Sequence, residues 1–147
     1  MRHLKRMIAF IAVLAMSASC VGSVYAANGS NAPQASPTLS MYTVWLDPGD
    51  NKGELDISFD VSATEWADSV GVSYFEIHKA SNGELVDTVR GTTSNGLRRE
   101  SASTYANTYT YSGVTSGVYY YAVIAVSALV GTTHDSRTLR TVSVKAP

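Results

Sequence analysis

The sequence contains few of the residue types from which catalytic and metal sites are most often built. It has one cysteine and three histidines in 147 residues, of which only His78 and His134 lie beyond residue 26, and two histidines are too few to supply the four Cys or His ligands of a zinc site. It has no Gly-x-Ser-x-Gly turn, which forms the nucleophile elbow of α/β hydrolases. The sequence therefore predicts a protein that is not an enzyme and has neither a cofactor nor a metal site.

Long apolar runs are also scarce, and the first one has the features of a targeting segment. Three basic residues precede an apolar stretch at residues 7–16, which is too short to span a bilayer. Val24 and Ala26 place small side chains at the −3 and −1 positions of a cleavage site. We expect a signal peptide over residues 1–26. In the alternative interpretation, Cys20 is the lipid-modified first residue of a lipoprotein. Either way, the chain is expected to be secreted, outside the cell or at its surface, without a membrane span.

If Ala26 ends the leader, the mature chain has no cysteine, and its stability must come from its core and not from disulfides. Residues 27–38 are rich in Asn, Ala, Ser and Pro and are expected to form a flexible spacer. Residues 39–147 are enough for one domain with a core of its own.

Charged residues are unevenly distributed. Acids outnumber bases by twelve to eleven in the whole chain, and by more once the basic leader is removed, which argues against nucleic acid as a partner. Ten acids lie within residues 27–87, whereas six bases lie within residues 88–147. We expect acidic and basic strands to become neighbours and neutralise each other. The alternative is an anionic ligand held by the basic half.

Short β-rich segments separated by turn residues dominate residues 39–147. Leu55, Ile57, Phe59 and Val61 alternate with polar residues, the pattern of a half-buried strand. Residues 63–70 are expected to form a helical turn, with Trp66 closing one end of the core, and residues 91–103 a loop. The pattern predicts an all-β fold, an antiparallel two-sheet sandwich, with strands at residues 39–46, 55–62, 72–79, 85–89, 104–111, 116–127 and 138–144.

Residues 116–127 form the longest apolar and aromatic run outside the leader and are expected to be the central strand. With Tyr119, Tyr121, Val123 and Ala125 facing inward, alternate residues would form an apolar outer strip. Such a strip can mark an interaction surface; the alternative is that the chain itself covers it. The candidate interaction face comprises Tyr74, Tyr120, Ala122, Ile124 and Val126.

The same strand resembles a known family. Tyr119, Tyr121, Val123, Ala125 and Val126 resemble the sixth strand of fibronectin type III domains. The resemblance implies that Tyr119 buries its ring and bonds its hydroxyl to nearby backbone. Residues 68–73, 109–113 and 135–138 are also similar to short, secreted, uncharacterised proteins of Gram-positive bacteria. These resemblances imply the immunoglobulin-like sandwich fold, and they imply no activity.

One further cluster has two interpretations. Asp47, Asp50, Asn51, Glu54 and Asp56 crowd a single turn, where oxygen ligands could bind calcium or simply satisfy turn geometry. We expect the ordinary turn. The expected function is a non-catalytic module that interacts with an extracellular protein or a cell-surface component. The alternative is a structural or cell-envelope component with no dedicated ligand.

Overall fold

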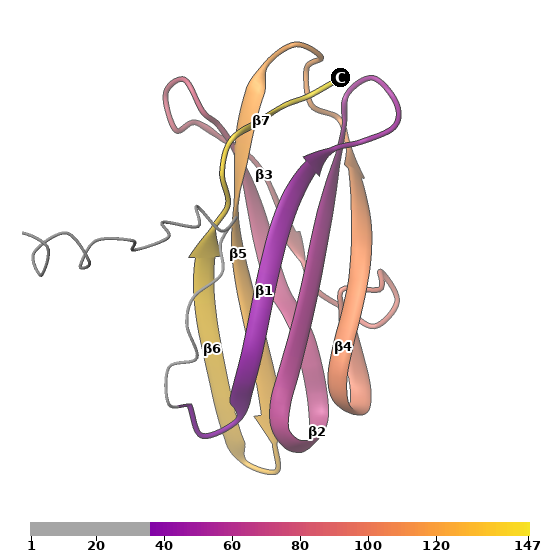
Figure 1. The fold of residues 1–147 in the computed structure, drawn as a ribbon, viewed down its shortest axis with the longest axis vertical. Helices are drawn as coiled ribbons and strands as arrows, with labels where there is room; N and C mark the ends of the chain where they lie inside the picture. Colours follow the sequence, from indigo (N-terminus) through magenta and orange to yellow (C-terminus); the bar gives the residue numbers. More distant parts are fainter. Residues whose placement is uncertain (1–35) are drawn as a thin grey trace, which may run out of the picture.

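The computed structural model describes residues 36–147, which form a seven-stranded antiparallel sheet without a helix (Figure 1). The expected all-β, antiparallel fold is confirmed. The leader, its cleavage site and residues 27–35 of the spacer lie outside the described residues. The strands are β1 (Leu39–Pro48), β2 (Glu54–Lys79), β3 (Leu85–Arg90), β4 (Arg98–Ser112), β5 (Tyr119–Val130), β6 (Thr133–Arg140) and β7 (Val144–Lys145).

Strand β2 organises the sheet because its two limbs pair with different neighbours. Residues 54–62 pair with β1 on one side and with residues 104–112 of β4 on the other. Residues 69–79 pair with β5, and on their other side with β3 and the beginning of β4. In Figure 1 the strand runs down, turns and returns. The strands are hydrogen-bonded in the order β1-β2-β5-β6; off this path, β3 and β4 pair with β2, and β7 pairs with β5.

The turn in β2 replaces the helical turn expected over residues 63–70, so that prediction was wrong. The register shifts between Ser62 and Ala67, which leaves the intervening residues outside the pairing with β4. The backbone N–H of Thr64 donates to the carbonyl of Thr38 at 2.9 Å instead of beginning a helix. Trp66, expected in the core, is 70% exposed because it lies on this protruding bend.

Both limbs of β2 face the same core. The predicted inward set of the first limb, Leu55, Ile57, Phe59 and Val61, is buried, so the alternation was interpreted correctly. From the second limb, Phe75 contacts two tyrosine rings of β4, with centroid distances of 5.4 Å to Tyr109 and 6.2 Å to Tyr111. The side chains that point away from this core therefore form two outward faces, one on each limb.

Two connections differ from those expected. β4 begins at Arg98, inside the expected loop, because Arg98 pairs with Gly71. Gly71 has a φ of +135°, and a Cβ there would lie 2.4 Å from the carbonyl oxygen of Leu97. That oxygen accepts a hydrogen bond from the N–H of Val72 at 2.7 Å, so glycine is needed for the close approach.

The single closing strand expected over residues 138–144 is divided into β6 and β7.

Candidate interaction surfaces

Strand β5 faces the core with the opposite set of side chains from the one expected. Tyr120 is 1% exposed, and Ala122, Ile124 and Val126 are fully buried. The prediction that these four residues form an outward interaction strip was wrong. They are core residues, packed in the same cluster as the inward side chains of β2.

The error is a slip of one residue. The resemblance to fibronectin type III domains placed Tyr119 in the core, whereas the structure leaves it 55% exposed. Tyr120 takes that place, and its hydroxyl accepts a hydrogen bond from the backbone N–H of Thr115 at 3.0 Å. Because successive side chains of a strand point to opposite faces, moving the anchoring tyrosine by one position inverts every assignment along the strand.

An aromatic outward face nevertheless exists on this side of the sheet, built from the complementary residues. Tyr74, the one outward prediction that holds, is half-buried and pairs with Ala125 and with Arg90. Tyr121 and Val123 are half-buried at outward positions of β5, next to the exposed Tyr119. We call this surface the tyrosine face; its members are Tyr74, Glu76, His78, Arg90, Tyr119, Tyr121, Val123, Arg140 and Lys145.

Tyr121 lies at the centre of the tyrosine face between two cationic or potentially cationic groups. The ring of His78, its direct partner on β2, stacks on it with centroids 5.1 Å apart and an interplanar angle of 5°. The guanidinium carbon of Arg140, on β6, lies 3.9 Å from the centroid of the Tyr121 ring. This distance is within the range of a cation–π interaction. The two contacts fix the orientation of the phenol ring.

His78 is itself held by two hydrogen bonds. Its Nε2 lies 3.1 Å from a carboxylate oxygen of Glu76, and its Nδ1 lies 3.1 Å from the carbonyl oxygen of Gly83. Both partners are acceptors, so an imidazolium that carries both protons satisfies the two contacts together. Both ring nitrogens are thus occupied by orienting contacts, and neither bonds a serine or threonine hydroxyl.

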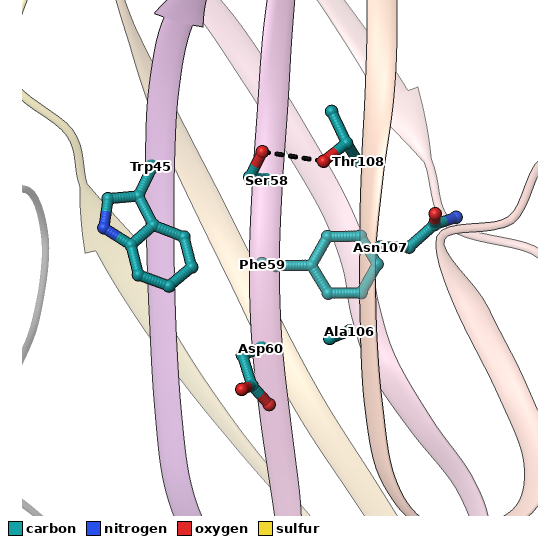
Figure 2. Close-up of a pocket in the computed structure, with 7 residues that line it drawn as sticks. All are labelled: Trp45, Ser58, Phe59, Asp60, Ala106, Asn107 and Thr108. Atoms are coloured by element: carbon teal, nitrogen blue, oxygen red, sulfur yellow. Dashed lines mark hydrogen bonds between the residues drawn. The ribbon is translucent and has the colours of Figure 1, made fainter.

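The other outward face belongs to β1, the first limb of β2 and the second half of β4. It carries a shallow hollow of about 480 Å³ lined by Trp45, Ser58, Phe59, Asp60, Ala106, Asn107 and Thr108 (Figure 2). The hollow follows from the register. Trp45 pairs with Ser58, and Asp60 pairs with Ala106, so small side chains lie beside the large indole.

The walls of the hollow have distinct chemistry. The indole of Trp45 on β1 forms an apolar side, and the carboxylate of Asp60 on β2 lies on the same face (Figure 2). The hydroxyls of Ser58 and Thr108 bond to each other at 2.8 Å. Within residues 36–147, the Asp60 carboxylate has neither a hydrogen bond nor an ion pair. The sequence carries one signal of this hollow: Trp45 lies between Val44 and Leu46, whose side chains point inward, so the indole must point outward. This signal was not used in the sequence analysis above.

This face, which we call the acidic face, carries charge of one sign. Its outward side chains include Asp47, Glu54, Asp56 and Asp60, and no lysine or arginine. Asp47 lies directly opposite Asp56 in the pairing of β1 with β2, an arrangement that destabilises a sheet through like-charge repulsion. One oxygen of Asp56 accepts a hydrogen bond from the Thr110 hydroxyl at 2.7 Å.

The expected neutralisation between acidic and basic strands does not occur through ion pairs. The three ion pairs in the described part of the chain are His78–Glu76, Lys79–Glu84 and Arg137–Asp135. Each joins residues close in sequence, and none joins an acid of the first half to a base of the second half. The tyrosine face carries Arg90, Arg140 and Lys145, so the asymmetry of the sequence becomes two oppositely charged faces.

The turn considered for calcium is held by its own hydrogen bonds. The backbone N–H and the side-chain amide of Asn51 both donate to one carboxylate oxygen of Glu54, at 3.1 and 2.9 Å. Over residues 36–147, no three histidine, cysteine, aspartate or glutamate side chains are grouped in a way that could hold a metal ion.

None of the described residues belongs to a helix that is long and apolar enough to cross a membrane. The chain matches no protein-family model, no curated protein and no solved structure at a significant level.

Proposed function

We propose that the protein is an exported, non-catalytic interaction module that binds an extracellular protein or a cell-surface component through its tyrosine face. The observation that carries this proposal is the Tyr121 ring, held between the imidazole of His78 and the guanidinium of Arg140. Tyrosine and arginine are the residue types on which binding energy most often concentrates in protein interfaces.

The rigidity of this cluster supports the proposal. Tyr121, His78 and Arg140 come from three adjacent strands, β5, β2 and β6, and not from a loop. Side chains already held in one orientation lose little conformational entropy when a partner binds. Tyr119, which is 55% exposed next to this cluster, extends the aromatic surface that a partner would cover.

The fold we propose is a two-sheet sandwich of the fibronectin type III kind. Pairing divides the strands into a group of β1, the first limb of β2 and most of β4, and a group of β3, the second limb of β2, β5 and β6. The bond from Thr115 to the Tyr120 hydroxyl resembles the tyrosine corner of immunoglobulin-like domains. Sandwiches of this type serve many functions, so the fold alone does not select a partner.

Export follows from the leader proposed for residues 1–26, with cleavage after Ala26. The environment outside the cell suits a module whose stability does not depend on a thiol. A partner at the cell surface or in the medium would then meet the tyrosine face directly.

The test is quantitative capture from native extracellular and cell-surface material with the mature protein. Tyr121→Ser and Arg140→Ser remove the two central groups of the tyrosine face. Trp66→Ser is the matched control, because it removes an exposed aromatic residue at the bend of β2. Circular dichroism establishes that both tyrosine-face variants are folded. We expect these two variants to fail to capture a specific component that wild type and the Trp66 variant capture.

Equal capture by all four proteins would show that the tyrosine face does not bind. If wild type captures nothing specifically, the alternative of a structural envelope component without a dedicated ligand is favoured. Direct titration of the isolated component against wild type and Tyr121→Ser then gives the ratio of dissociation constants. We expect a ratio of at least about tenfold, the effect of losing one central interface residue.

A further inference from the structure

The two outward faces complement each other in charge. The acidic face presents four carboxylates and no base, whereas the tyrosine face presents Arg90, Arg140 and Lys145. The one carboxylate on the tyrosine face, that of Glu76, contacts the His78 ring at 3.1 Å. We propose that the partner of the tyrosine face is the acidic face of a second copy of this chain. This inference rests on the proposed function, because the tyrosine face is one of its two sides.

Arg140 supplies a specific fit between the faces. One side of its guanidinium lies over the Tyr121 ring at 3.9 Å, and within residues 36–147 the group forms no ion pair. The hollow on the acidic face offers what such a group needs, the indole of Trp45 beside the carboxylate of Asp60. A guanidinium stacks on aromatic faces and pairs with carboxylates along its edge. Arg140 of one copy thus lies between its own Tyr121 and the neighbour's Trp45.

The acidic face also has an electrostatic reason to accept a basic partner. Asp47 and Asp56 face each other directly across β1 and β2, and within residues 36–147 neither carboxylate forms an ion pair. A cation of the neighbouring copy relieves this repulsion, and Lys145 and Arg90 are the remaining bases of the tyrosine face. Binding of the neighbouring copy therefore stabilises the pairing of β1 with β2. The attraction between the two copies weakens as salt screens the charges.

The geometry of the two faces determines the form of the assembly. Both faces point away from the common core on different limbs of β2, so one copy offers both at once. An interface between two different patches is heterologous, and it continues from copy to copy until a ring closes or a filament grows. The structure therefore assigns to this chain a head-to-tail assembly and not a two-fold dimer.

Sedimentation velocity of the mature protein tests the assembly directly. We expect the weight-average mass at least to double as concentration rises at low salt. It should return to that of the monomer between about 0.01 M and about 1 M salt, where the screening length falls from about 30 Å to about 3 Å. A monomer at every concentration and salt would overturn this inference, while the capture experiment above still decides whether the tyrosine face binds another partner.

Two charge variants test the faces themselves. Asp60→Arg alters only the acidic face, and Arg140→Asp alters only the tyrosine face, so each protein alone should remain monomeric at low salt. Each keeps one intact face, so an equal mixture should form a complex at least twice the monomer mass. The matched controls are Glu65→Arg and Arg99→Asp, at exposed positions outside the proposed contact, and both should associate like wild type.

The remaining outcomes are also decisive. Association that persists in Asp60→Arg or in Arg140→Asp alone would overturn the proposed contact, because it would place the interface elsewhere. Failure of the mixture to associate would overturn the head-to-tail arrangement. Thermal unfolding of each variant establishes that it is folded, and Trp45→Phe, which keeps a smaller aromatic ring in the hollow, serves as a second acidic-face variant that should weaken association without a change in charge.

Discussion

The hydroxyl of Tyr120 accepts a hydrogen bond from the backbone N–H of Thr115 at 3.0 Å, joining the turn before β5 to the strand itself. The ring of Tyr120 is 1% exposed, so the same side chain fills the core and closes the turn. Its neighbour Tyr119 makes neither contact and points outward. This pair of tyrosines determines which side chains of β5 are buried.

Removing the two hydroxyls separately should therefore have unequal effects. Tyr120→Phe leaves the N–H of Thr115 without its protein partner and should lower the free energy of unfolding by about 1–2 kcal/mol. Tyr119→Phe should change it by less than about 0.5 kcal/mol, as is usual for surface positions. Denaturant titration of both variants measures the difference. Equal losses would mean that the bond from Thr115 contributes nothing to stability.

Charge at adjacent positions of β5 should distinguish its two faces. Ile124 is fully buried, so Ile124→Glu places an unpaired carboxylate in the core and should cost about 4 kcal/mol or more. Val123→Glu, one residue earlier and outward, should cost about 1 kcal/mol at most. The measurement is the free energy of unfolding, with circular dichroism to establish whether Ile124→Glu folds at all. A stable, folded Ile124→Glu protein would contradict the assigned parity.

Substitutions at two glycines should distinguish the cost of a steric clash from the cost of an unfavourable backbone conformation. Gly71 and Gly117 both have positive φ, but a Cβ at Gly71 would meet the Leu97 carbonyl oxygen at 2.4 Å, whereas a Cβ at Gly117 has no atom within 4 Å. Gly117→Ala should cost about 1 kcal/mol from conformation alone. Gly71→Ala should cost more, about 3 kcal/mol, because β2 and the segment before β4 must separate. Thermal and denaturant unfolding should rank the two variants in this order.

Stability at alkaline pH should depend on Tyr111. Burial, together with the 3.0 Å hydrogen bond from its hydroxyl to Asp87, raises the pKa of Tyr111 to about 12. Below pH of about 10, the ordinary tyrosine value, the phenol is protonated in both states and its contribution to stability is complete. Between about pH 10 and 12 only the unfolded chain ionises, so stability falls as pH rises.

Tyr111→Phe should remove that part of the alkaline loss, and Tyr119→Phe should leave it unchanged. Free energies of unfolding, measured at intervals from pH 9 to 12 (about the range over which the two states differ), test this expectation. Parallel profiles for wild type and Tyr111→Phe would show that the phenol ionises alike in both states.

Processing of the leader has two distinguishable products. Cleavage after Ala26 gives an exported chain that begins at Ala27, and this is the product we expect from the small residues at Val24 and Ala26. The lipoprotein alternative gives a diacylated chain that begins at Cys20. Intact mass spectrometry of the exported protein separates the two. A Cys20→Ser variant should be processed normally if our assignment is right.

The fold class was predictable because period-2 alternation is a strong local signal. Leu55 to Val61 on β2 show it plainly, and the structure buries the residues that the pattern selects. The bend at residues 63–66 was not predictable from the same signal, because a four-residue interruption between two strands also fits a helical turn. The pairing of the following residues with β4 and β5, beginning with Ala67 opposite Ala102, keeps the chain in the sheet.

The faces of β5 were not predictable, for a related reason. Three consecutive tyrosines at positions 119–121 give either parity a plausible aromatic anchor. The choice is made by the turn before the strand, where Thr115 reaches the Tyr120 hydroxyl and not that of Tyr119. The hollow beside Trp45 was equally hidden, because it depends on Ala106 of β4 lying opposite Asp60 of β2, a pairing between residues distant in sequence.

The long strand β2 also affects how the domain comes apart. It pairs with β1, β3, β4 and β5. Because β4 pairs with both limbs, neither limb can leave the sheet without releasing part of β4. We expect local opening to cost least at the two-residue β7, whereas loss of β2 from the sheet would release β1, β3 and β4 together, because each of these three strands pairs only with β2. A proteolytic cut at the exposed bend beside Trp66 would divide this unit into two fragments, neither of which keeps a complete core.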